Sequence, residues 1–125
     1  MANAAYVWSG SEWVAIASAI PQTHQRGITY VSDTAYTLGV NDIGKSILFS
    51  SNDAVTVTIP SDSVYSFSVG QTIELVQMGS GTVTVQSGGD PDLRYRLGFA
   101  TFGQYSKIEL MKINSDEWLL SGDLD

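Results

Sequence analysis

Hydrophobic and polar residues alternate with a period of two along much of this chain. Residues 55–59 (VTVTI) place Val and Ile on one face and Thr on the other. Residues 72–77 (TIELVQ) and 82–86 (TVTVQ) repeat the arrangement with Ile, Leu and Val on the apolar side. Because successive side chains of a β-strand point to opposite faces, each segment predicts a strand with one buried face.

Turn-forming residues between alternating segments predict hairpins. The tripeptide GSG at 79–81 predicts that residues 71–86 form one β-hairpin. A second hairpin is predicted over residues 105–122, with its turn at NSDE (114–117). Residues 6–17 have the same build on a smaller scale, with a Ser- and Glu-containing turn between two short apolar segments.

The remaining segments contain few helix-forming windows. Residues 61–70 predict a bridging strand or an irregular crossing, and the Gly-rich, aromatic stretch 87–103 predicts a long surface loop with one short strand. Short strands separated by turn signals are typical of all-β folds. We therefore predict an antiparallel β-sandwich or a jelly-roll-like barrel over residues 28–125, preceded by a hairpin arm and polar linker over residues 1–27.

Composition restricts the partners of this domain. The 125 residues include 6 Lys plus Arg and 13 Asp plus Glu, which gives a formal net charge of −7. Nucleic-acid binding depends on Lys and Arg, so nucleic acid is not an expected partner. An acidic membrane surface is not expected either, whereas a basic protein surface remains open.

The chain contains no Cys, which excludes disulfides and thiolate zinc sites. Its first residues lack the basic and apolar regions of a secretory signal, and no apolar run is long enough to span a bilayer. The sequence therefore predicts a soluble protein that is made in a cytoplasm.

Residues 39–46 (GVNDIGKS) match the phosphate-binding pattern G-x-x-x-x-G-K-[ST]. A phosphate-binding loop joins a buried parallel strand to a helix, whose N-terminus faces the phosphates. Here the apolar run 47–49 and the turn residues 51–53 predict a strand instead of a helix. We therefore interpret the match as a turn in which Gly44 has positive φ and Lys45 is a solvated charge.

The candidate catalytic and metal-binding residues lack the companions that they would need. His24 is the only His and lies in the polar linker without the nucleophile and carboxylate of a triad. Asp90 and Asp92 lack the several converging oxygens of a calcium site. Asp116 and Glu117 occupy a predicted turn, which is not the setting of a glycosidase carboxylate pair. We therefore predict no enzyme activity, no catalytic residue, no cofactor and no bound metal.

Aromatic residues are the remaining candidates for a site. Trp118 begins an apolar strand and is predicted to lie in the core. Exposed aromatics of the 87–103 region could stack on a sugar or pack on a subunit, and packing is favoured because no set of polar ligands accompanies them. The predicted interface residues are Trp8, Trp13, Tyr95, Phe99, Phe102 and Tyr105.

Residues 36–124 resemble a β-rich module of tailed-phage virion proteins, found in tail fibres, head fibres and small capsid-associated proteins. The resemblance is carried by short motifs that follow one another in the same order. They are YTL at 36–38, D-x-GK at 42–45, AVTVTIP at 54–60, F-x-VG at 67–70, Gln77, VTV at 83–85, QYS at 104–106, WLL at 118–120 and GDL at 122–124.

Two parts of the chain depart from that module. The module's usual loop before QYS is replaced by DPDLRYRLGFATF at 90–102, so the resemblance does not extend to the loop to which receptor or sugar roles are tied. Residues 1–35 match the module poorly, although YVWSGSEWV at 6–14 resembles small Trp hairpins of phage structural proteins.

The resemblance implies a virion structural protein. The expected role is a capsid decoration, or cement, protein that forms homotrimers, binds the major capsid protein and lies on the outer surface of the capsid after synthesis in the host cytoplasm. The alternative is a tail-fibre or head-fibre tip domain that binds host surface glycans. We further hypothesise that the arm, residues 1–27, reaches a neighbouring protomer or the shell.

Overall fold

A computed structural model describes the backbone of residues 6–8, 13–15 and 26–125, and the side chains of residues 26–125. Within this part of the chain the regular structure is β, apart from a short 3-10 turn, η1 (Val40–Asp42). The all-β prediction is therefore confirmed. The strands from residue 26 onward are β3 (Gly27–Val31), β4 (Ala35–Thr37), β5 (Lys45–Phe49), β6 (Val55–Ile59), β7 (Thr72–Gln77), β8 (Val83–Ser87), β9 (Asp92–Tyr95), β10 (Lys107–Asn114) and β11 (Glu117–Gly122).

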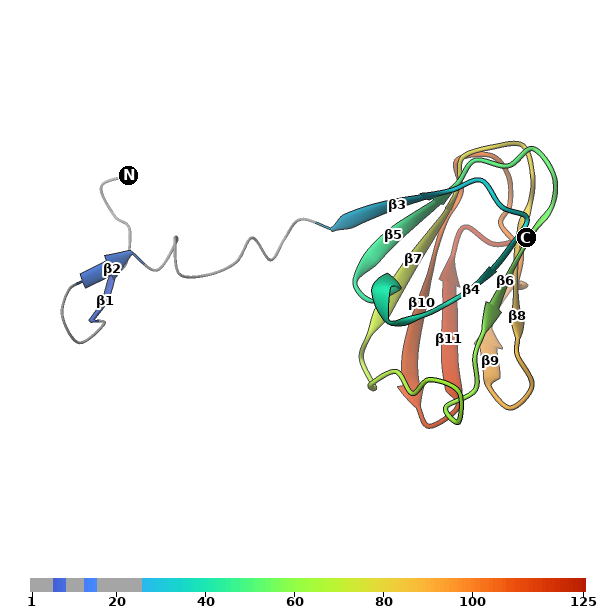
Figure 1. The fold of residues 1–125 in the computed structure, drawn as a ribbon. Helices are drawn as coiled ribbons and strands as arrows, with labels where there is room; N and C mark the ends of the chain where they lie inside the picture. The colour runs from blue at the N-terminus through green and yellow to red at the C-terminus, as the bar shows by residue number, and fades with distance from the viewer. Residues whose placement is uncertain (1–5, 9–12, 16–25) are drawn as a thin grey trace.

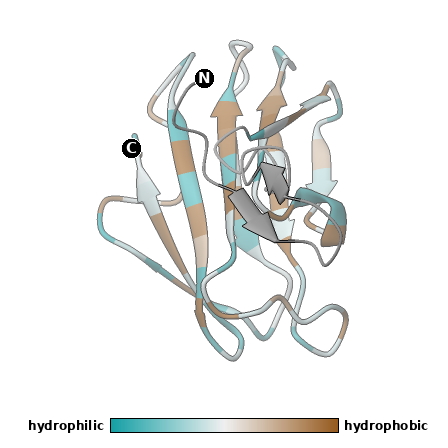
Figure 2. Ribbon diagram, turned by 90° about the vertical axis from the view of Figure 1, so that its left-hand side faces the viewer, coloured by the Kyte–Doolittle hydropathy of each residue, from teal (hydrophilic) through white to brown (hydrophobic). Residues whose placement is uncertain are grey.

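Two sheets lie face to face and enclose the core (Figure 1). The larger sheet has the order β3-β5-β7-β10-β11-β9, and the smaller has the order β4-β6-β8. Apolar and polar segments alternate along the strands (Figure 2), as the period-two pattern predicts. In β6, for example, Val55, Val57 and Ile59 are buried, whereas Thr56 and Thr58 are partly exposed.

The first six strands of this body form three successive coils, each with one strand in each sheet. The coils are β3–β4, β5–β6 and β7–β8, and neighbouring coils stack with their strands parallel. After the third coil, β10 pairs antiparallel with β7 and β11 pairs antiparallel with β10. β9 then pairs parallel with β11 at the far edge of the larger sheet.

This arrangement corrects two expectations. Among the strands of the two sheets of the body, β7–β10–β11 pair antiparallel and all other pairs are parallel; outside these strands, Ala100 and Leu124 form isolated antiparallel bridges with Thr84 and Thr101. Residues 71–86 are not a hairpin, because β7 and β8 belong to different sheets. The glycine-containing turn at 79–81 carries the chain from one sheet to the other instead of reversing it within one sheet.

The turns at one end of the coils are stacked in direct contact. The backbone N–H of Ser50 donates to Val31 O (2.9 Å), and that of Met78 donates to Phe49 O (2.8 Å). A Cβ atom at Gly81 would lie 1.9 Å from Asp53 O, which is a backbone clash. Glycine is therefore required here by the close approach of successive turns rather than by hairpin geometry.

The C-terminal hairpin prediction is confirmed by the β10–β11 pair. Its turn contains Asp116 at φ 45°, a left-handed conformation that Asp adopts more readily than most residues. In the arm, β1 (Tyr6–Trp8) pairs antiparallel with β2 (Trp13–Ala15), with Trp8 opposite Trp13. This confirms the pairing of the small hairpin, while the side chains of its residues lie outside the described part of the chain.

Trp118 is fully buried between the sheets, as the sequence predicts. The irregular crossing 60–71 places Phe67 against it, with ring centroids 5.1 Å apart and an interplanar angle of 76°. Edge-to-face packing of this kind adds about 0.5–1.5 kcal/mol beyond the burial of area. The crossing therefore closes one end of the core.

A buried lysine holds that crossing in place. Lys112 is only 1% exposed, and its Nζ donates to Asp62 Oδ1 (2.6 Å) and to Phe67 O (3.0 Å). Asp62 and Asp116 also exchange backbone N–H to carboxylate bonds of 2.7 and 2.9 Å. The pKa of the Asp62 carboxyl is lowered, because Lys112 and the Asp116 N–H donate to its ionised form. These bonds join the crossing to the β10–β11 hairpin.

Candidate interaction site

The aromatic stretch after β9 is fixed by backbone hydrogen bonds on both of its sides. Phe99 O accepts from the N–H of Val85 (2.8 Å), and Thr101 N–H donates to Val83 O (2.9 Å). On the other side, the N–H of Asp125 donates to Ala100 O (2.9 Å). The segment 99–101 therefore lies between β8 and the C-terminus and closes this flank of the sandwich.

A buried polar pair attaches the same segment to the core. The hydroxyl of Thr101 donates to Gln77 Oε1 and accepts from the N–H of Val83 (3.0 Å). The amide of Gln77 in turn donates to Gly79 O (3.1 Å). Because buried polar groups are costly when unpaired, this chain of bonds fixes the position of the segment.

An apolar recess of about 240 Å³ lies between this segment and β8. Tyr95 and Phe99 form one wall, with ring centroids 5.0 Å apart and planes at 88°. They remain 47% and 44% exposed, so both rings are accessible from solvent. The residues that line the recess are Val85, Gln86, Ser87, Leu93, Tyr95 and Phe99.

A second recess of about 290 Å³ is lined in part by Arg96 and Leu97, which lie between Tyr95 and Phe99 in the chain. Leu97, which is exposed, forms part of its wall. Residues 95–99 therefore contribute to both recesses, and we call them the aromatic ridge. The lining of the second recess consists of Arg96, Leu97, Leu119, Leu120, Ser121, Gly122 and Leu124.

Arg96 lies within the ridge and lines the second recess, whereas the charges of β9 itself, Asp92 and Arg94, alternate with Leu93 and Tyr95 along the strand. Arg94 Nε donates to Glu117 Oε2 (2.8 Å), and this bond raises the pKa of the guanidinium. Asp92 lies 3.7 Å from the same guanidinium. The side-chain polar groups among the residues that line the recess beside Tyr95 are the amide of Gln86 and the hydroxyls of Ser87 and Tyr95. Its chemistry suits packing or ring stacking.

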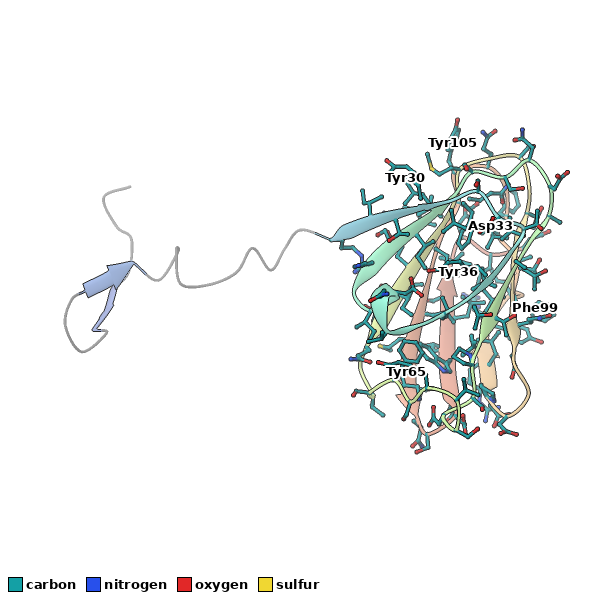
Figure 3. All side chains as sticks on the ribbon, viewed as in Figure 1. Tyr30, Asp33, Tyr36, Tyr65, Phe99 and Tyr105 are labelled. Carbon is teal, nitrogen blue, oxygen red and sulfur yellow. The ribbon has the colours of Figure 1, made fainter. Side chains whose placement is uncertain are left out.

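The structure brings together two of the four aromatic residues that were predicted in this region. Tyr95 and Phe99 form the ridge, whereas Phe102 is exposed and lines neither recess. Tyr105 lies at the end of the sandwich, away from Phe99 on its flank (Figure 3). The backbone of Tyr105 has φ 71° and its N–H donates to Gln77 O, so it serves a turn. The side chains of Trp8 and Trp13 lie outside the described residues.

Sequence reasoning missed the buried Lys112 and the exposed pair Ile28 and Tyr30 on β3. Lys112 shares the parity of Ile108 and Leu110 along β10, so the alternation itself places this charge on the buried face. Ile28 and Tyr30 form a second exposed apolar pair on β3, and their parity predicts a common outward face.

The segment that matches the phosphate-binding pattern is a turn followed by a strand. Gly44 has φ 69°, and β5 begins at Lys45. Asp42 is buried and accepts from the Tyr36 hydroxyl (2.6 Å) and from the Gly39 N–H (2.8 Å). Burial and the bond to this carboxylate both raise the pKa of Tyr36. The residues of this segment therefore stabilise the return from β4 to β5.

Within residues 26–125, no helix is long and apolar enough to cross a membrane, and no three His, Asp or Glu side chains gather as metal ligands would. A scan against protein-family models finds no match for the chain, and a search of curated proteins finds no significant match.

Proposed function

We propose that this protein is a structural component of a tailed-phage virion that decorates the outer surface of the head shell as a cement protein. The proposal includes assembly as a homotrimer and binding to the major capsid protein. It is supported by the resemblance of residues 36–124 to a virion module and by the exposed aromatic ridge, which suits contact with another protein.

The residues that carry the resemblance have structural roles in this fold. Phe67 and Trp118 pack together in the core, and Gln77 holds Thr101. Asp42 caps the turn before β5, and Gly44 provides its positive φ. These roles explain why such motifs would recur among proteins that share a scaffold, and they leave specific binding to other residues.

The ridge lies within 90–102, the stretch in which the chain departs from the module. It is the single observation that carries the proposal: two half-exposed rings beside an apolar recess, with a second recess at the residues between them, are held on a fixed backbone. Exposed apolar patches with polar surroundings mark protein interfaces, and aromatic residues supply much of the binding energy there.

A second candidate function is a tail-fibre or head-fibre tip domain that binds host surface glycans. The observation that favours it is the placement of Gln86 and Ser87 beside the rings of Tyr95 and Phe99, since a sugar can stack on a ring and bond to an adjacent amide. Electron microscopy of antibody-labelled particles distinguishes the two candidates, because label on the head supports the first and label on the tail supports the second.

Sedimentation with phage heads that lack this protein tests the ridge directly. We expect the parent protein to co-sediment, and Tyr95→Ala/Phe99→Ala to weaken binding by about 2 kcal/mol or more, roughly 30-fold. Phe102→Ala is the matched control, since Phe102 is an exposed aromatic outside both recesses. Full occupancy by the double variant would remove the ridge from the contact.

Light scattering tests the assembly, for which we expect a mass that is a multiple of three 13.5-kDa chains. Several linked contacts are needed to hold a shell clamp, so a monomer at micromolar concentration would count against the cement role itself. The arm was predicted over residues 1–27, but Gly27 begins β3 and Arg26 is bonded to β5, so deletion of residues 1–25 tests the arm. We expect the body to stay folded and trimeric and binding to heads to fall.

A further inference from the structure

The four edges of the two sheets differ in how they are protected. Segment 99–101 covers β8, β4 is only three residues long, and β9 carries the exposed charges of Asp92 and Arg94. Short strands, charges and covering segments all prevent an edge from pairing with another chain. β3 has five residues and has none of these features, and among the described strands β5 is its only neighbour.

The side chains of β3 add to this exposed edge. Ile28 is 58% exposed and Tyr30 is 74% exposed. Tyr30 is next to Leu48 in the register, and Leu48 is next to Val76 on β7. The outer face therefore has an apolar row that ends at β3, where Tyr30 lies at the margin of the sheet (Figure 3).

The hydrogen bonds of β3 show which backbone groups are directed away from β5. Val31 O accepts from the N–H of Ser50 (2.9 Å), so residue 31 faces β5. Since the peptide groups of a strand alternate in direction, Gly27 and Thr29 face β5 as well. The N–H and C=O groups of Ile28 and Tyr30 consequently point outward, where a further strand would bond to them.

We infer that β3 pairs antiparallel with β3 of a second copy of this chain, about a two-fold axis at Thr29. Ile28 of one copy then lies opposite Tyr30 of the other, and each such pair exchanges two backbone hydrogen bonds. Thr29 lies opposite its own equivalent as a non-bonded pair. All four outward peptide groups of each copy at these two residues are satisfied in this register.

Side-chain chemistry favours a second copy in this orientation. The pairing continues the apolar row, because Ile28 of the second copy lies beside Tyr30 of the first. Arg26 precedes β3 and Asp33 follows it, so antiparallel pairing places the basic end of one strand beside the acidic end of the other, with the Arg26 guanidinium itself bonded to β5. A parallel arrangement would bring like charges together.

The local charge permits the approach even though the chain carries a net charge of −7. Arg26 lies over β5, where its guanidinium donates to Ser46 Oγ and to Lys45 O, both at 3.1 Å. Together with Lys45 it gives this corner two cations.

The inference does not rest on the proposed function. β3 and β9 are the opposite edges of the larger sheet, so the contact leaves the aromatic ridge free. If the protein forms trimers, the β3 contact would join two chains from different trimers. If it forms no trimer, the same contact would give a simple dimer. The contact is isologous in both cases and links two chains.

A single cysteine tests the register, because the chain has no native Cys. Opposed residues of a non-bonded antiparallel pair have Cα atoms about 4.5 Å apart, which suits a disulfide. We expect Thr29→Cys at micromolar concentration to form a disulfide-linked dimer under mild oxidation. Val64→Cys, at an exposed position on the crossing 60–71, measures linkage by random collision.

A second substitution keeps the test falsifiable. Adding Ile28→Lys to Thr29→Cys places a positive charge opposite Tyr30 of the other copy, and the two introduced charges repel each other across the contact. Disulfide linkage should then fall to the level of Val64→Cys. The circular dichroism spectrum should stay that of the parent, which shows that the fold is intact. If Thr29→Cys links no faster than Val64→Cys, the inference is wrong. If residues before Arg26 cover β3, Thr29→Cys would also link no faster than Val64→Cys, and the inference that β3 pairs with a second copy would be wrong in that case too.

Discussion

Loss of the carboxylate that faces Lys112 should destabilise the domain strongly. Asp62→Asn removes one negative charge and keeps the shape of the side chain and an oxygen acceptor. Lys112 would remain 1% exposed, with Phe67 O and the new amide as its acceptors. Removing one member of a buried pair costs about 3–5 kcal/mol, and the retained acceptors place this variant near 3.

Urea denaturation followed by circular dichroism measures this cost. A domain of this size has a total stability of about 5–15 kcal/mol, so the loss is a large fraction. With a slope of about 1–3 kcal/mol per molar urea, the midpoint should fall by roughly 1–3 M. The slope itself should be unchanged, because the same surface is exposed on unfolding.

The double variant Asp62→Asn/Lys112→Met separates the charge from other effects. Methionine fills a similar volume without a charge, and apolar replacement of a buried ion pair is often neutral or stabilising. We therefore expect the double variant to recover most of the lost stability. The reasoning is refuted if Asp62→Asn loses less than about 1 kcal/mol, or if the double variant is no more stable than the single one.

Three further outcomes follow from the same geometry. The folded-state pKa of Asp62 is lowered below its ordinary value of 3.8. The stability that its carboxylate contributes is therefore complete above that pH and is lost as pH falls through the folded-state pKa. In urea denaturation at a series of pH values, the free energy of unfolding should fall less steeply with acid for Asp62→Asn than for the parent. Gly81→Ala should cost about 1–3 kcal/mol by clashing with Asp53 O, whereas Gly103→Ala, which meets open space, should cost far less by the same measurement. Trp118→Ala should lose about 3–5 kcal/mol, and a parent-like thermal midpoint would show that this ring is not in the core.

The strands were predictable from the sequence because burial imposes the period-two pattern locally. Residues 55–59 and the β10–β11 hairpin follow the pattern closely. The direction of pairing was not predictable in this way. A glycine-containing turn such as 79–81 looks the same whether it reverses a chain within one sheet or carries it to the next, and only the stacking against Ser51 and Asp53 distinguishes the two.

The candidate site was predictable in part. The aromatic content of 90–102 identified Tyr95 and Phe99, but which rings meet depends on the bonds of Phe99 and Thr101 to β8, which are distant in sequence. The β3 edge has no motif. Its importance depends on which strands lie beside it, and that information is absent from a local pattern.

The coil order also sets a schedule for folding during synthesis. β7 begins the third coil, yet its other edge stays unpaired until the end of β10, 37 residues after the end of β7, has left the ribosome. At about 5–20 residues per second, the nascent chain presents that open edge, with its apolar row, for roughly 2–7 s. Unpaired strand edges of this kind invite pairing between neighbouring chains on one messenger. Production of soluble protein should therefore depend on how fast residues 78–114 are translated. Synonymous codon changes in this stretch should alter the yield, although they leave the amino-acid sequence and the folded structure unchanged.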